Sequence, residues 1–276
     1  MALANAAPCR TLKRKRSEAG FESRQNIVHG RSAAKTLDRA THVLATEATA
    51  LGIVAQLYQT DPVARTGLVD AVDLVTMAHR KRGKVVVCGV GKSGLVGSKM
   101  VATMKSLGIG SSFLHAAEAV HGDLGDIREN DVLLFISYSG RTAELLNILP
   151  HIPKSTPMIA LTSHTAREAC PLLDGRPTSV LLPAPIHEPE EVSFGVAAPT
   201  TSTTVAMAVG DMLALTVAEQ LLDSSVAEVF KHNHPGGAIG ETATKRLQIH
   251  DAETLPTPEM LSPRLSPRSS DDGNVD

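Results

Sequence analysis

The stretch KVVVCGVGKSGLVGSKM, from Lys84 to Met100, constrains the fold of this chain more than any other. Residues 85–88 form an unbroken apolar run, which is typical of a strand buried on both faces in a parallel sheet. Glycines at 89, 91 and 94 then let the backbone turn sharply and let a ligand approach its amides. Apolar residues return at helical spacing as far as Leu107, before Gly108. The stretch predicts a strand, a glycine turn and a helix, an arrangement that binds anionic ligands in α/β proteins.

The glycine turn has several interpretations. It is not a Walker A loop, because GxxxxGK[ST] would need glycine in place of Val86. It matches the dinucleotide fingerprint GxGxxG, but the strand expected next, at 111–114, is followed by His115 where that fingerprint requires an acid. A sugar-phosphate site with Lys92 as its cation is the third interpretation. A tight turn with a solvated lysine is the simplest one.

Further short apolar runs alternate with helical patterns along the chain, which predicts a parallel sheet with helices on both faces. Two amphipathic helices are expected before the sheet and one long helix after it. The proline-rich loop at 183–199 is long enough to indicate a functional or mobile segment. The further strands are expected at 111–114, 132–137, 158–162 and 179–182, and the helices at 37–59, 62–82 and 202–222.

Composition narrows the class of protein. The 276 residues are 42% hydrophobic and 20% charged, which suits a soluble globular chain. The net charge of −2 argues against a surface that binds nucleic acid. The three cysteines have no metal-type spacing, which favours a reduced, cytoplasmic protein. No membrane span is expected, since the long uncharged run at 192–210 is broken by Pro199 and a polar block.

The domain is expected at 37–248, between two disordered ends. The first end, 1–36, carries a Lys/Arg cluster at 13–16 that is either a nuclear or mitochondrial address or a basic arm without one. The other end, 249–276, is rich in serine and proline.

Two more polar turns resemble the glycine turn, because one follows a predicted strand and the other opens a predicted helix. SYSGRT at 137–142 follows an apolar strand, and TTSTT at 200–204 opens the last long helix. Hydroxyl groups and free amides at a helix start are donors for a phosphate, although Ser139 and Thr142 also suit ordinary capping. In a parallel sheet these three turns converge on one edge.

Several side chains suit acid–base chemistry. His115 and His121 flank Glu118 and are interpreted as general acid–base groups or, less readily, as metal ligands. Glu144 and Glu191 follow predicted strands, so each is a candidate base or a solvated acid. A histidine on a rigid turn, at 234, is a further candidate or a purely structural residue.

Taken in order, these motifs resemble the sugar isomerase (SIS) domain family, in its arabinose-5-phosphate isomerase branch. The resemblance covers about residues 40–245. The combination of HxAEAxHGDLG with HPGGxxG is specific, whereas no single motif is. The motifs are GVGKSG at 89–94, HAAEAVHGDLG at 115–125, SYSG at 137–140, APTTSTT at 198–204 and HPGGAIG at 234–240.

The resemblance implies a three-layer α/β/α sandwich around a five-stranded parallel sheet, and interconversion of D-arabinose 5-phosphate and D-ribulose 5-phosphate through an enediolate. It implies no required cofactor, with His115 able to capture an inhibitory Zn²⁺. It implies a sugar phosphate as the partner, and a homodimer or homotetramer with active sites between subunits. The implied catalytic residues are Lys92, His121, Glu144, Glu191 and His234, and the implied substrate-binding residues are Gly91, Ser93, His115, Ser137, Ser139, Thr142 and Thr203.

The chain also departs from the family pattern. Tyr138 and Arg141 stand where the family usually has an amide and an acid, and a longer proline-rich loop precedes Glu191. By this resemblance, the short tail is expected to stand in place of the paired regulatory domain that often follows in the family. Two other functions stay open: a sugar-phosphate sensor without catalysis, since SIS domains also serve as regulators, and a dinucleotide oxidoreductase on the GxGxxG match.

Overall fold

The computed structural model describes residues 19–235, and the side chains of residues 32–235. Five strands form one parallel sheet with the order β2-β1-β3-β4-β5. The expected strands are therefore confirmed, each within a residue or so of its predicted bounds. The strands are β1 (Val85–Gly89), β2 (Ser111–His115), β3 (Val132–Ile136), β4 (Met158–Thr162) and β5 (Val180–Pro183).

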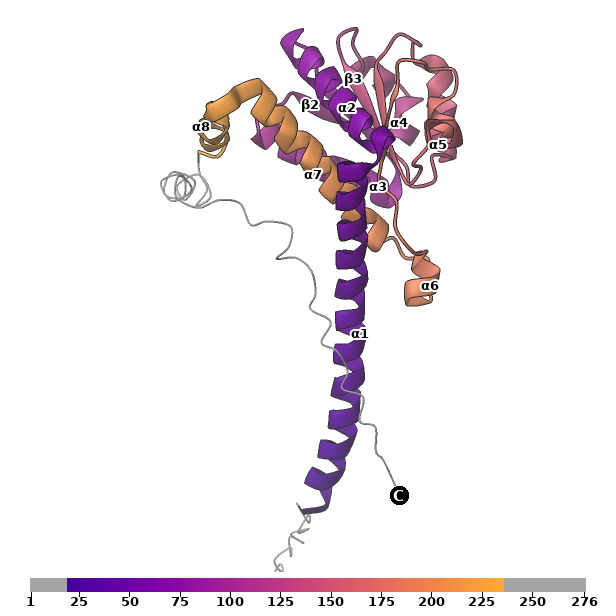
Figure 1. Cartoon of the computed structure of the whole chain (residues 1–276), viewed down its shortest axis with the longest axis vertical. Helices are drawn as coiled ribbons and strands as arrows, with labels where there is room; N and C mark the ends of the chain where they lie inside the picture. Colours follow the sequence, from indigo (N-terminus) through magenta and orange to yellow (C-terminus); the bar gives the residue numbers. More distant parts are fainter. Residues whose placement is uncertain (1–18, 236–276) are drawn as a thin grey trace, which may run out of the picture.

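Eight α-helices accompany this sheet in the described part of the chain (Figure 1). Short 3-10 turns occupy several of the connections, for example Asp123–Asp126 and Leu149–His151. The helices are α1 (Ala19–Thr60), α2 (Pro62–Arg80), α3 (Gly91–Ser106), α4 (Ala116–Ala119), α5 (Ala143–Ile148), α6 (Glu190–Phe194), α7 (Thr201–Leu222) and α8 (Val226–His232).

Alternate residues of each central strand face opposite layers. Val85 and Val87 of β1 lie in the core shared with α1, α2, α3 and α7, whereas Val86 and Cys88 lie in the core shared with α4 and α5. All five residues of β1 are buried, as the apolar run predicts for a strand covered on both faces. The three-layer α/β/α sandwich is thus confirmed.

Three elements differ from the sequence expectation. Helix α1 begins at Ala19 rather than at residue 37, so residues 19–36, which were expected to be disordered, are helical. This segment lacks a long apolar stripe, so a search for amphipathic spacing does not detect it. Helix α6 lies inside the segment expected to be a loop, and α8 follows α7 without having been predicted. The tail at 249–276 and the first 18 residues lie outside the described residues.

In the described part of the chain, one helical stretch, Thr201–His232, is long and apolar enough to cross a membrane, and α7 forms its first part. Length and composition are weak evidence here, because the core helix of a soluble protein passes the same test. Ten residues of α7 are buried, and they include Val205, Val209 and Leu213 in the core of the domain. Packing against α1, α2 and α3 therefore accounts for its apolar character.

Candidate functional site

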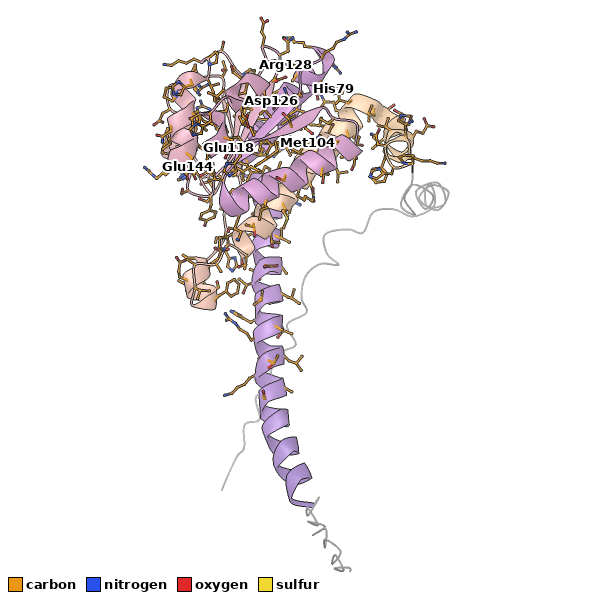
Figure 2. The ribbon with its side chains drawn as sticks, turned by 180° about the vertical axis from the view of Figure 1, so that it is seen from behind. His79, Met104, Glu118, Asp126, Arg128 and Glu144 are labelled. Carbon is orange, nitrogen blue, oxygen red and sulfur yellow. The ribbon has the colours of Figure 1, made fainter. Side chains whose placement is uncertain are left out.

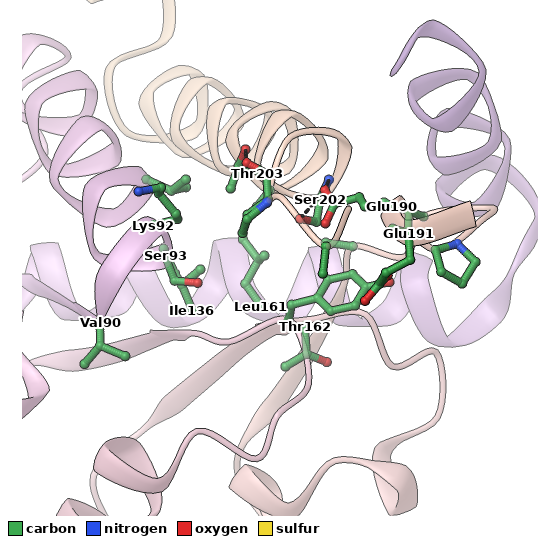
Figure 3. A pocket seen from close by; sticks show the side chains of 18 residues that line it. Val90, Lys92, Ser93, Ile136, Leu161, Thr162, Glu190, Glu191, Ser202 and Thr203 are labelled. Carbon is green, nitrogen blue, oxygen red and sulfur yellow. Dashed lines mark hydrogen bonds between the residues drawn. The ribbon is translucent and has the colours of Figure 1, made fainter. Parts of the chain in front are cut away.

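A pocket of about 480 Å³ lies at the carboxyl edge of the sheet (Figure 3). The start of α3, the residues after β3, the end of β4, α6 and the start of α7 all contribute to it. The three turns that the sequence placed at one edge therefore border the same pocket. Its polar lining residues are Lys92, Ser93, Tyr138, Thr162, Glu190, Glu191, Ser202 and Thr203.

The glycine turn provides one wall of this pocket. Gly91 has a φ of 55°, a left-handed conformation that glycine adopts without strain. A Cβ on Gly89 would lie 3.1 Å from the amide nitrogen of Gly94, so the strand end approaches the first turn of α3 closely. This turn places Lys92 and Ser93 in the pocket lining, and Lys92 is the one cation among the described residues that line it.

The loop after β3 is held by the two residues that follow the neighbouring strand β4. The Ser163 hydroxyl donates to the carbonyl of Tyr138 (2.7 Å), and His164 Nε2 lies 2.9 Å from the carbonyl of Ser139. Within the loop, the hydroxyl oxygens of Ser137 and Thr142 are 2.7 Å apart. These contacts fix the backbone that carries Tyr138, whose side chain lines the pocket.

Tyr138 lies in an acidic environment. Its burial, followed by the negative charges of Glu190 and Glu191, raises the pKa of its phenol above the usual value of 10.0. The side chain is nevertheless 45% exposed. The pocket therefore contains a neutral phenol as a hydrogen-bond donor beside two carboxylates.

The two neighbouring glutamates of α6 have different surroundings. Glu190 Oε1 accepts hydrogen bonds from the amides of Thr200 (2.7 Å) and Ser202 (3.0 Å) and from the Ser202 hydroxyl (2.9 Å). It therefore caps the start of α7, where free amides favour a negative charge. Glu191 is exposed and lines the pocket. Figure 3 shows both glutamates on the side of the pocket opposite Lys92.

The structure gathers only part of the predicted site in this pocket. Lys92, Ser93, Glu191 and Thr203 line it. Gly91 is next to Lys92, and Ser137 and Ser139 flank the lining residue Tyr138 without lining the pocket themselves. Thr142 lies in the same loop, with its hydroxyl oxygen 2.7 Å from that of Ser137. The remaining predicted residues, His115, His121, Glu144 and His234, lie in two further places.

One of these places comprises the end of β2 and the helices α4 and α5. His115 ends β2, and its Nδ1 atom is buried without a hydrogen-bond partner among the described residues. His121 follows α4 and is exposed, as is Glu144 on α5. Helices α4 and α5 contact each other, and Figure 2 shows Glu118 and Glu144 on this side of the molecule.

His234 lies in the third place, after α8. Its Nδ1 atom is 2.7 Å from the carbonyl of Phe230, and its ring stacks on that of Phe230 at 4.1 Å. Its Nε2 atom is 3.3 Å from the hydroxyl of Ser106, the last residue of α3. Lys92 is on the first turn of the same helix, about 20 Å away at 1.5 Å per residue. Within one chain, His234 therefore does not reach the pocket. The rest of the HPGGAIG motif, from residue 236, lies outside the described residues.

Within residues 19–235, no three or more histidine, cysteine, aspartate or glutamate side chains form a group that could hold a metal ion. Capture of Zn²⁺ at His115 stays a prediction.

Sequence reasoning did not assign Glu190 or Tyr138 to the pocket. Glu190 was not separated from its neighbour Glu191, although a pair of acids after Pro189 is a usual signal for a helix start. Tyr138 was noted as a departure from the family pattern and not as part of the site. Its position directly after a buried strand and Ser137 is the signal that places it at the ligand-binding edge.

Comparison with known proteins supports the family suggested by the motifs. The SIS domain family matches residues 79–216. The arabinose 5-phosphate isomerase KdsD of Pseudomonas aeruginosa is 42% identical over 177 residues, which are 63% of this chain and 52% of that protein. The chain thus spans about half the length of the curated relatives of this name that it matches.

Solved structures agree with this comparison. A putative phosphosugar isomerase involved in capsule formation from Bacteroides fragilis is 31% identical, with a TM-score of 0.59, and 98% of it is covered by 73% of this chain. An Escherichia coli CFT073 protein in complex with arabinose 5-phosphate is also 31% identical, with a TM-score of 0.60 and the same shares covered. On the fold, the motifs and these matches, the chain belongs to the SIS domain family.

Proposed function

We propose that this protein is an aldose–ketose isomerase of a phosphosugar, with D-arabinose 5-phosphate and D-ribulose 5-phosphate as its substrate pair. The observation that carries the proposal is the pocket in which Lys92 faces Glu191 across a cavity of about 480 Å³. The name of the Pseudomonas relative and the ligand of the Escherichia coli structure support the choice of substrate.

The reaction needs three chemical events. The sugar ring opens, a base removes the proton from C2 of the aldose, and a proton is returned to C1 of the resulting enediolate. Oxidation at C2 is balanced by reduction at C1 within the same molecule, so the reaction as proposed uses no redox cofactor. A cation beside the enediolate oxygens stabilises the charge that develops there.

The pocket residues suit the second event. Glu191 is the proposed base, because it is exposed to the pocket and is not engaged in the cap that occupies Glu190. Lys92 is the proposed electrostatic partner of the enediolate, on the opposite side. The neutral phenol of Tyr138 can donate a hydrogen bond to a sugar hydroxyl between them.

The phosphate is proposed to bind between the loop after β3 and the start of α3. Ser137, Ser139 and Thr142, which lie beside the pocket without lining it, are the proposed hydroxyl donors, and free amides at the start of α3 add donors. The backbone contacts from Ser163 and His164 hold this loop before ligand arrives, which lowers the entropic cost of binding.

The remaining predicted residues are proposed to act from a second copy of the chain. His234 is separated from Lys92 of its own chain by the length of α3, and His121 and Glu144 lie outside the pocket. A homodimer or homotetramer that joins these surfaces would complete the site, with His121 or His234 for ring opening. The exposed apolar residues Leu37 and Leu44 of α1 suit such an interface.

The direct test is proton exchange in D₂O followed by ¹H NMR. Isomerisation through an enediolate places deuterium at C1 of the ketose product and, in reverse, at C2 of the aldose. We expect this exchange with the arabinose–ribulose pair, and less with hexose phosphates. Tight binding of the sugar phosphates without turnover would replace the proposal with the sensor function. Turnover of a hexose pair alone would change the proposed substrate.

A further inference from the structure

We propose that Arg39 and His42 of α1 are positioning residues, which hold α6 so that Glu191 faces the pocket. The kinetic part of this inference rests on the proposed isomerase function, whereas its structural part does not. Helix α6 has five residues, too few for a helix to be stable on its own in water. Contacts from elsewhere in the fold must therefore determine where its two glutamates lie.

The carboxyl end of α6 is attached to α1. Arg39 Nη2 donates to the carbonyl of Phe194 (2.8 Å), and His42 Nε2 lies 2.9 Å from the carbonyl of Ser193. These carbonyls belong to the last residues of a helix, which lack partners within the helix itself. A positive charge at this end also favours the helix dipole.

The ring of Phe194 strengthens the same attachment. The guanidinium carbon of Arg39 lies 5.4 Å from the centre of this ring, a cation–π distance. The His42 ring meets it edge to face, with centroids 5.9 Å apart. Arg39 and His42, which lie about one turn apart on α1, thus both contact the Phe194 ring, and each also contacts one carbonyl group at the end of α6. Figure 1 shows α6 beside α1, away from the sheet.

The amino end of α6 is attached to α7 through the Glu190 cap on Thr200 and Ser202. Glu191 is between these two attachments, one residue from the cap and two from Ser193. Its backbone carbonyl accepts a hydrogen bond from the Gly195 amide (2.9 Å), which closes the helix. Release of the α1 attachment would leave Glu191 on a segment fixed at one end only.

The structural test is hydrogen–deuterium exchange of the segment around α6, measured on the full chain. We expect the Arg39→Ala/His42→Ala variant to exchange the amides of Ser193 and Gly195 at least about tenfold faster than wild type. Lys35→Ala is the matched control, since it also removes an exposed cation from α1. The same exchange rates in both variants would overturn the attachment. Both substituted positions are exposed, and an unchanged Tm would verify that the domain is intact.

The kinetic test separates positioning from binding. Misplacement of the base should lower kcat, whereas the proposed phosphate loop after β3 is not substituted. We expect kcat of the double variant to fall about tenfold or more with KM changed less than about twofold. His42→Gln keeps a donor for the Ser193 carbonyl and should therefore retain more activity than His42→Ala. Phe194→Tyr keeps the aromatic ring and should retain more activity than Phe194→Leu.

The two tests distinguish failure of the proposed isomerase function from failure of the positioning role. A wild-type chain that isomerises no sugar phosphate would refute the proposed function, and the exchange experiment would still decide whether α1 holds α6. Faster exchange of α6 with unchanged kcat would overturn the positioning role while leaving the isomerase function intact.

Discussion

The carboxylate of Glu190 on α6 accepts a hydrogen bond of 2.9 Å from the hydroxyl of Ser202 on α7. The same oxygen accepts from the amides of Thr200 and Ser202, so one side chain satisfies three donors at the start of the long helix. This cap joins α6 to the layer that covers the sheet, and it leaves the neighbouring Glu191 available to the pocket.

Removal of this cap is expected to destabilise the fold. Glu190→Ala leaves two helix-start amides without their acceptor and should lower the free energy of unfolding by about 1–2 kcal/mol. Glu190→Gln keeps an acceptor oxygen and should cost about half as much. The midpoint of urea unfolding measures both. Glu219→Ala, at an exposed position of α7, is the control and should change the midpoint little. A midpoint for Glu190→Ala equal to that of the control would contradict the cap.

Lys92→Ala tests the enediolate role. If this lysine stabilises the enediolate, kcat should fall roughly 10²-fold with a modest change in KM, because an electrostatic donor is lost in the transition state. If it only neutralises the phosphate, KM should rise instead. Lys92→Arg should not restore activity, because a planar guanidinium replaces a compact ammonium in a tight turn.

The matched control is Lys99→Ala. Lys99 is on the same helix and pairs with Asp211 outside the pocket. It should leave both kinetic constants near wild type. Wild-type kcat in Lys92→Ala would exclude the proposed role.

Tyrosine ionisation provides a prediction on pH. The chain has two tyrosines and no tryptophan, so ultraviolet titration reports both phenols without interference. Burial raises the pKa of Tyr58, whose hydroxyl donates to the carbonyl of Pro183, and burial with two carboxylates raises the pKa of Tyr138. We expect the native protein to ionise above pH 10.0, the usual value, and the urea-unfolded chain to ionise near it.

The sign of the linked stability change follows. Above about pH 10 the unfolded chain binds fewer protons than the native one, so the free energy of unfolding should fall as pH rises further. Glu191→Gln removes one negative charge and should lower the pKa of Tyr138 without moving that of Tyr58. A native titration that coincides with the unfolded one would show that the phenols are not in these environments.

The sheet could be predicted because its signal is local. Each central strand is an unbroken apolar run such as residues 132–136, and burial on both faces leaves no polar position to obscure it. The glycine turn was predictable for the same reason. The left-handed φ of Gly91 depends on the residue being glycine, which the sequence states directly.

Helix α6 could not be predicted because its causes are distant. Its carboxyl end depends on Arg39, 155 positions away, and its amino end on the placement of α7. No periodicity in five residues reveals these contacts. The site residues were predicted from motifs, but motifs do not state which chain supplies each residue. Lys92 and Glu191 lie in one pocket, whereas His121, Glu144 and His234 stay predictions that a second copy would test.

Complementation between inactive variants tests whether a second copy of the chain supplies His234. Lys92→Ala and His234→Ala are each expected to reduce activity strongly if both residues serve one site. If the site combines Lys92 of one chain with His234 of another, a mixed dimer has one doubly damaged site and one intact site. Equal mixing with subunit exchange should then restore about a quarter of wild-type activity, since half of the dimers are mixed and half of their sites are intact. Light scattering at micromolar concentration should give at least a dimer mass.

A site built from one chain predicts a different outcome, because every site in the mixture then carries one of the two substitutions. Activity would stay at the level of the separate variants, and the subunit-sharing proposal would fail. The control is a mixture of Lys92→Ala with Lys92→Ala/His234→Ala, in which no combination of chains contains Lys92. Recovery in the first mixture but not in the control would assign the histidine to the neighbouring chain, in agreement with its separation from Lys92 of its own chain along α3.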